Sequence, residues 1–68
     1  MAKILTVRPI RSESGAIVRW DLEVSGGCVG QYSKPANAKA AAKRFAHPRQ
    51  RLRWRHDPPS GVYQALVA

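Results

Sequence analysis

Four arginines at every second position form the part of this sequence best suited to chemistry. They are Arg49, Arg51, Arg53 and Arg55, in a stretch that reads Arg-Gln-Arg-Leu-Arg-Trp-Arg-His over residues 49–56. A guanidinium group donates hydrogen bonds in a planar fork that fits phosphate and carboxylate oxygens. We therefore expect this stretch to bind an anionic partner, and a nucleic-acid backbone offers phosphates at regular spacing.

The alternation predicts a β-strand over residues 49–56, because successive side chains of a strand point to opposite faces. Leu52 and Trp54 are then expected in a core, while Arg51, Arg53 and Arg55 stand together on the other face. We call these three residues the arginine row. Alternate strand residues are roughly 6.5–7 Å apart, so the row spans about 13 Å. It would face about four phosphates of one duplex strand.

Basic charge is concentrated in the same third of the chain. Residues 34–56 contain eight lysines and arginines and no acid, which equals the whole net charge of +8. Such a concentration is typical of nucleic-acid-binding surfaces, although it also serves solubility. Lys39, Lys43 and Arg44 precede the arginine stretch, and we expect them to form a second basic surface on a helix.

The surrounding sequence predicts a single α+β domain over residues 1–68. Its elements follow the order β-β-β-α-β-β, with one helix packed on one face of a mostly antiparallel sheet. The clearest strand is residues 17–24, where Trp20 and Leu22 alternate with Asp21 and Glu23. Both tryptophans, Trp20 and Trp54, alternate in phase with a leucine and are expected in the core. The other expected strands are residues 3–10, 28–32, 49–56 and 62–67.

The helix is expected to begin with Ser33 as its cap and to continue through Ala46. Pro35 is tolerated in the first turn, and alanine is the best helix former. The apolar stripe expected to face the sheet consists of Ala38, Ala41, Ala42 and Phe45. Because the helix is short, its stability must come from packing this stripe on the sheet.

The last expected strand, Val62–Val67, has a single polar residue, Gln64. A strand this apolar needs cover on both faces, or one of its faces or edges forms a subunit contact. We therefore expect a homodimer in which this strand takes part; in a monomer the strand must lie between two others.

Candidates for catalysis are few. His47, His56 and Cys28 are the side chains considered for binding zinc or for acting as a nucleophile and its base. Their spacing fits no familiar zinc site. Cys28 could act as a nucleophile with a histidine as its base, but a core-facing cysteine is favoured. No catalytic residue, metal or cofactor is therefore expected. Asp21 and Glu23 are interpreted as surface charges, and they would pair with Arg51 and Arg53 if the two strands were neighbours.

Composition gives the expected compartment. A single cysteine, Cys28, forms no internal disulfide, which fits a reducing environment. No apolar run reaches the ~20 residues of a membrane span, and the N-terminus lacks the pattern of a signal peptide. We expect a cytoplasmic protein with no membrane partner.

Two resemblances add to this interpretation. Trp20, the step Gly30-Gln-Tyr32 and the alanine-rich helix after Ser33-Lys34 resemble a small bacterial domain family of unknown function over about residues 16–67, which implies the β-β-β-α-β-β fold and no activity. Residues 16–46 also look like the three-stranded DNA-binding modules of plant ethylene-response factors and the arm-binding domains of tyrosine recombinases.

The second resemblance implies that the outer face of the sheet enters the major groove of DNA. This chain departs from that pattern, because Asp21 and Glu23 replace basic residues on the central strand and leave Arg19 as its one basic contact. The sequence thus predicts a non-catalytic, weakly specific nucleic-acid-binding domain, with DNA preferred to RNA. The alternative is a protein interaction module, as a homodimer or with an acidic protein partner.

Overall fold

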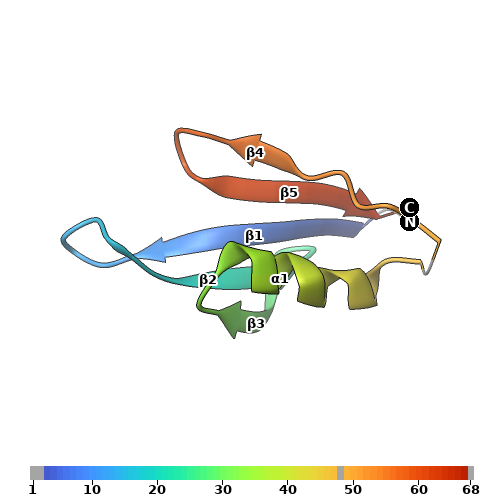
Figure 1. The fold of residues 1–68 in the computed structure, drawn as a ribbon, viewed down its shortest axis with the longest axis horizontal. Coiled ribbons are helices and arrows are strands. Elements are labelled where there is room, and N and C mark those ends of the chain that lie inside the picture. Colours follow the sequence, from blue (N-terminus) through green and yellow to red (C-terminus); the bar gives the residue numbers. More distant parts are fainter. Residues whose placement is uncertain (1–2, 48, 68) are drawn as a thin grey trace.

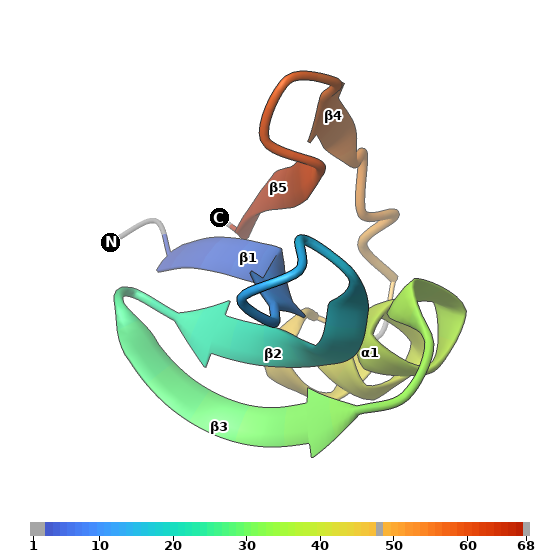
Figure 2. The ribbon, with the colours of Figure 1, turned by 90° about the vertical axis from the view of Figure 1, so that its left-hand side faces the viewer.

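The computed structural model describes residues 3–47 and 49–67. One antiparallel five-stranded sheet has the strand order β3-β2-β1-β5-β4, and a short helix covers one of its faces (Figures 1 and 2). The elements along the chain are β1 (Lys3–Arg11), β2 (Ile17–Val24), β3 (Gly27–Tyr32), α1 (Pro35–Ala42), a 3-10 turn (Lys43–Phe45), β4 (Arg55–Asp57) and β5 (Val62–Val67). The predicted α+β class and element order are confirmed.

The first three strands form a meander whose reversals follow from local sequence. Ser25 and Gly26 both have positive φ, +50° and +91°, between β2 and β3. A two-residue reversal with both residues in this region matches the twist of the flanking strands, and glycine adopts it without strain. The hairpin predicted from Ser25-Gly26-Gly27 is therefore present.

The core lies between α1 and the face of the sheet that it covers. Alternate residues of β1, β2 and β5 point to this face, so the period of two in the sequence becomes one apolar layer. The buried cluster consists of Leu5, Val7, Trp20, Leu22, Ala38, Ala42 and Val67. Trp20 is 9% exposed, which confirms its predicted place in the core.

The helix is shorter than predicted and begins one residue later. Lys34, in an extended conformation, is the N-cap residue and makes no side-chain cap hydrogen bond, so Ser33 does not cap the helix. Pro35 explains the shift, because a residue before proline is held extended and the proline itself suits the first helical position. Beyond Ala42 the chain tightens to a 3-10 turn with three residues per turn, and Phe45 leaves the apolar stripe and is 36% exposed.

The predicted strand over residues 49–56 is wrong in extent. Only Arg55–Asp57 pairs with β5, over three residue pairs, and residues 49–54 have no regular structure. Leu52 and Trp54 are half-buried and pack against the core on the helix side. Their burial draws this segment, which we call the crossover, out of the plane of the sheet on its way from the helix to β4 (Figure 2).

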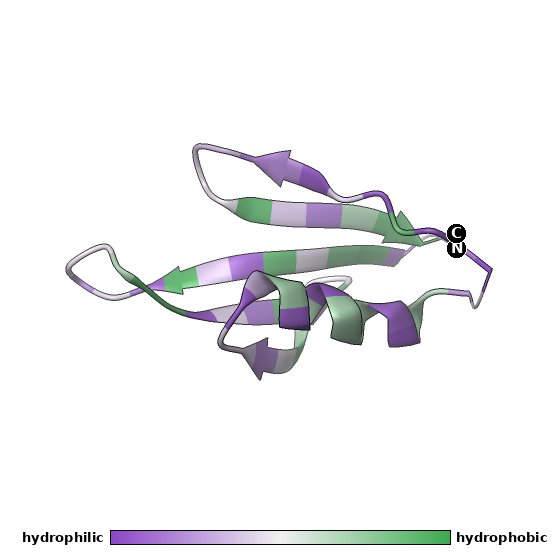
Figure 3. Cartoon of the chain, viewed as in Figure 1, coloured by the Kyte–Doolittle hydropathy of each residue, from purple (hydrophilic) through white to green (hydrophobic). Residues whose placement is uncertain are grey.

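β5 lies inside the sheet, between β1 and β4. Five of its residues pair with β1 from Lys3 to Val7, whereas only Val62 to Gln64 pair with β4. The strand therefore lies between two others, as expected from the sequence for a monomer, although its last three residues have a strand neighbour on one side only. The crossover that runs past these last residues of β5 is mostly hydrophilic (Figure 3).

Candidate nucleic-acid interface

The arginine row is preserved although most of its strand is absent. Arg51, Arg53 and Arg55 are exposed, while Leu52 and Trp54 between them are half-buried. An extended chain alternates its side chains whether or not it joins a ladder, so two apolar anchors are enough to orient the row. Since those anchors face the helix side, the row faces the other way, toward the open face of the sheet.

A hollow of about 500 Å³ lies between the row and β5. We call it the arginine groove. Its floor comes from alternate residues of β1 and β5 on the open face, and its outer rim comes from the crossover. The lining residues are Ile4, Gln50, Arg51, Arg53, Arg55, Gln64, Ala65 and Leu66. The volume is in the range of sites that bind small organic groups.

The two sides of the groove are joined by Gln50. Its side-chain Nε2 donates a hydrogen bond of 3.4 Å to the backbone carbonyl of Leu66. This contact replaces the ladder that a continuous strand would have made at the same place. It holds the crossover near β5 while leaving the hollow open above it.

A second hollow of about 370 Å³ continues the groove along β4 and β5. Arg55 and Gln64 line both hollows, and Arg8 joins them in the second. We call these two adjoining hollows the channel; three arginines line its first part, and Arg8, Arg55 and Asp57 line its second part.

Glu23 and Asp21 on the open face pair with other arginines, not with the row, and the third acid there, Asp57, accepts a hydrogen bond from Ser60. Arg8 Nε lies 2.9 Å from Glu23 Oε2, and Arg19 Nε lies 3.1 Å from Asp21 Oδ1. Within residues 3–47 and 49–67 these are the ion pairs present, and none involves the row. Pairing of Asp21 and Glu23 with Arg51 and Arg53 was expected only if their strands were neighbours. The strand order excludes it, because β1 and β5 separate β2 from β4.

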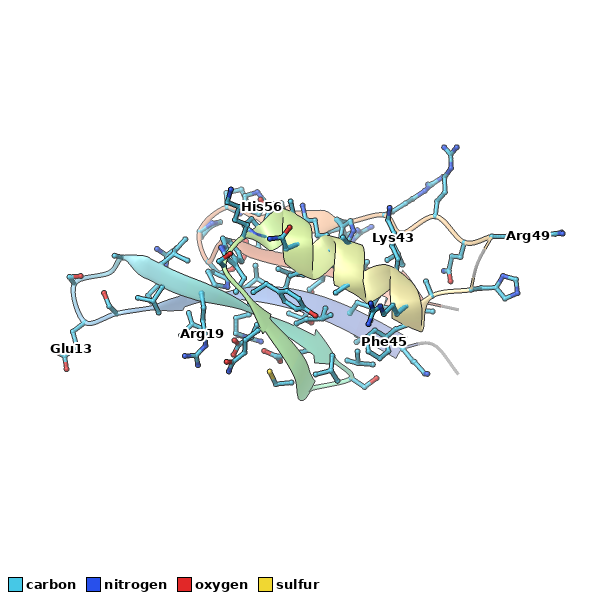
Figure 4. The ribbon with its side chains drawn as sticks, turned by 60° about the horizontal axis from the view of Figure 1, so that its bottom comes forward. Glu13, Arg19, Lys43, Phe45, Arg49 and His56 are labelled. Carbon is cyan, nitrogen blue, oxygen red and sulfur yellow. The ribbon has the colours of Figure 1, made fainter. Side chains whose placement is uncertain are left out.

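The remaining predicted contacts do not form one surface with the row. Arg49 extends away from the body of the protein at one end of its long axis, whereas Arg19 lies toward the opposite end (Figure 4). Lys43 and Arg44 are exposed on the 3-10 turn after α1, on the helix side. Arg51, Arg53 and Arg55 are thus the predicted residues that the fold brings together around a hollow.

Lys39 is occupied by aromatic rings. Its Nζ lies 3.6 Å from the centroid of the Tyr63 ring and 5.9 Å from that of Trp54. His56 stacks on Tyr63 with centroids 4.3 Å apart. A cation over an aromatic face is attracted by the ring quadrupole, so this lysine links α1 to Tyr63 of β5 and to Trp54 of the crossover. The predicted role of Lys39 as a phosphate contact has no support in this arrangement.

Cys28 is exposed, and its predicted core position is wrong. An irregularity in the β2–β3 register pairs Cys28 with Glu23, although Gly30 pairs with the preceding Leu22. The extra residue in β3 turns Cys28 onto the open face, beside Glu23. No group of three or more metal-binding side chains occurs among the described residues.

Sequence reasoning missed the floor of the groove. Ile4 and Leu66 are cross-strand partners that point to the open face, and they are 47% and 66% exposed. The signal was present, because both are apolar residues out of phase with the core positions Leu5 and Val67. Their meeting is a consequence of the β1–β5 register, which the sequence does not state.

No helix in residues 3–47 and 49–67 is long and apolar enough to cross a membrane. Comparisons of the chain with protein families, with curated proteins and with solved structures find no match. The two resemblances noted in the sequence therefore stay predictions, and the geometry of the groove carries the functional argument.

Proposed function

We propose that this chain is a small non-catalytic domain that binds the phosphate backbone of nucleic acids through the arginine groove, with DNA as its preferred partner. Arg51, Arg53 and Arg55 contact phosphates, and the exposed cations Arg49, Lys43 and Arg44 add long-range attraction. Phosphate contacts carry no base identity, so sequence specificity is weak. The lone exposed thiol of Cys28 fits a cytoplasmic protein.

The observation that carries the proposal is that no acid among the described residues lines the arginine groove and that no ion pair among them involves the row, although Asp57 lines the second hollow beside Arg55. Three exposed guanidinium groups line one hollow, and the ion pairs of the described residues lie elsewhere on the open face. Like charges so close together repel one another, and this cost is relieved when a polyanion binds. Arginine also fits phosphate in a bidentate geometry that lysine lacks.

The direct test is a titration of labelled oligonucleotides at low salt, of about 50 mM, where counterion release favours binding. We expect the parent to bind and the variant with Arg51, Arg53 and Arg55 all replaced by glutamine to bind much more weakly. Glutamine keeps a long polar side chain, so folding is preserved. Absence of binding by the parent removes the proposal.

A second candidate function is supported by exposed apolar side chains. Val29 on the edge strand β3 is 49% exposed, and Ile17 and Val18 on β2 are 43% and 58% exposed outside the groove. Unpaired edges and apolar surface invite pairing with a second copy or with an acidic protein. We propose this interaction module as the alternative. A mass of twice the chain by light scattering favours a homodimer. A single-chain mass at high concentration removes the homodimer and leaves the acidic protein as the partner of this alternative.

A further inference from the structure

We infer that the arginine groove is built for single-stranded nucleic acid, with Ile4 and Leu66 as the platform on which an unpaired base lies. This inference rests on the proposed function and adds the form of the partner. It follows from the apolar floor, which phosphate binding alone does not use.

The floor and the rim of the groove have different chemistry. On the β5 side, Ile4 and Leu66 expose apolar surface side by side, since they are paired across β1 and β5. On the crossover side stand the three guanidinium groups. A single strand has the same two-sided character, with phosphates along one side and bases, whose faces are apolar, along the other. The groove therefore complements a strand lying along β5.

A polar group is placed where the edge of a base would lie. Gln64 points to the open face two residues before Leu66, and it is paired with Arg55 across β4 and β5. Its amide offers both donors and an acceptor, so it can bond to the edge of any base. This arrangement favours contact with bases without selecting one of them.

A duplex fits the groove less well. The bases of a duplex are paired and stacked inside the double helix. A protein surface that does not enter the major or minor groove of the DNA therefore meets phosphates and sugars. The arginines could then bind, but Ile4 and Leu66 would remain exposed or face charged groups. Covering this apolar surface is favourable only with a partner that presents apolar area of its own.

A second copy of the chain is also a poor occupant of this groove. A symmetric dimer places the same patch of both copies face to face. Such a contact here would bring two arginine rows together, with no acid lining the hollow to compensate. Like charges opposed across an interface are unfavourable. An anionic strand with exposed bases satisfies both halves of the groove.

The test compares three DNA probes of equal length, about ten nucleotides, within the site size of small single-strand binders. The probes are a mixed-sequence single strand, an abasic strand with the same phosphates, and a duplex. We expect the intact strand to bind about five- to tenfold more tightly than the abasic one, at the low end of base stacking because the platform is aliphatic. We expect it also to bind more tightly than the duplex.

The matched variants separate the platform from general surface effects. Replacing Ile4 and Leu66 by threonine should lower affinity for the intact strand to the level of the abasic strand and leave abasic binding unchanged. Ile17 and Val18 are 43% and 58% exposed and lie outside the groove. Replacing these two by threonine should change the affinity for neither the intact nor the abasic strand. Threonine suits strands, and denaturant unfolding checks that both variants fold.

The outcomes distinguish the inference from the function on which it rests. Equal affinity for intact and abasic strands, or tighter binding of the duplex, overturns the inference and leaves phosphate binding by the arginines in place. Equal loss in the two double variants also overturns it. Failure of the parent to bind any probe overturns both.

Discussion

The two halves of the open face contain similar charges and differ in what those charges can do. On β1 and β2, Arg8 and Arg19 each form an ion pair with a carboxylate, at nitrogen–oxygen distances of 2.9 and 3.1 Å, which are those of hydrogen bonds. On the side of β4 and β5, no acid among the described residues lines the arginine groove, and Asp57 lies beyond Arg55 in the second hollow. The comparison teaches that net charge is a poor guide to a binding surface, because neighbours decide which cations remain available.

The helix side gives a third environment for a cation. Lys39 is half-buried over Tyr63 and Trp54, and it supports packing instead of facing solvent. One chain thus uses basic residues in ion pairs, in aromatic packing and in an open groove.

Trp20→Ala should show how strongly the covered face differs from the open one. Trp20 is buried and lies 6.0 Å from Tyr63 between ring centroids. Truncating a buried tryptophan costs about 3–5 kcal/mol, which is enough to unfold a domain whose whole stability is about 5 kcal/mol. Urea denaturation should find this variant largely unfolded.

The control for this prediction is Leu66→Ala on the open face. Leu66 is 66% exposed, so the free energy of unfolding should change by about 0.5 kcal/mol or less. A folded Trp20→Ala variant that has lost nucleic-acid affinity would contradict the assignment of faces.

Lys39→Met should separate packing from binding. Methionine keeps the length of the side chain and removes its charge, so the cation–π contacts are lost, at a cost of about 0.5–1 kcal/mol. Affinity for nucleic acid should fall no more than in Lys43→Met, whose side chain is exposed and makes the same charge change. A larger loss of affinity in Lys39→Met would show that this lysine contacts the ligand.

Much of the fold was predictable because alternation and turn residues act locally. Residues 17–24 form β2 as predicted, and the glycine turn after it follows from positive φ. The strand predicted over the arginine stretch is mostly absent for a physical reason. The alternation is satisfied by Leu52 and Trp54, which pack against the core although their segment joins no strand ladder. Whether such a segment also joins a ladder depends on the distant β5, which no local pattern reports.

The candidate site was only half predictable. The row of arginines is a feature of the sequence, and its orientation followed from Leu52 and Trp54. Its floor depends on the register of β1 with β5, and its freedom from acids depends on the order of strands. Both are properties of pairing between segments far apart in the chain.

Glu23→Gln is the smallest change and the sharpest test of the opening comparison. It removes the partner of Arg8, whose side chain is half exposed and lines the channel beside Arg55. An exposed ion pair contributes at most about 1 kcal/mol, so stability should change little. Freeing one more guanidinium should make the slope of log affinity for single-stranded DNA against log salt steeper by up to about 0.7. An unchanged slope would show that the bound strand does not extend to Arg8.

Phosphate binding by the arginine row is tested by the slope of log affinity for single-stranded DNA against log salt, measured for two triple variants with the same change in charge. The row variant has glutamine in place of Arg51, Arg53 and Arg55. The helix variant has glutamine in place of Lys34, Lys43 and Arg44, which are exposed around the helix. Each lost phosphate contact makes the slope shallower by about 0.7 on a single strand. We expect the slope to become shallower by about 2 units for the row variant and by well under 1 unit for the helix variant. Equal decreases would contradict this expectation, because net charge alone would then explain binding.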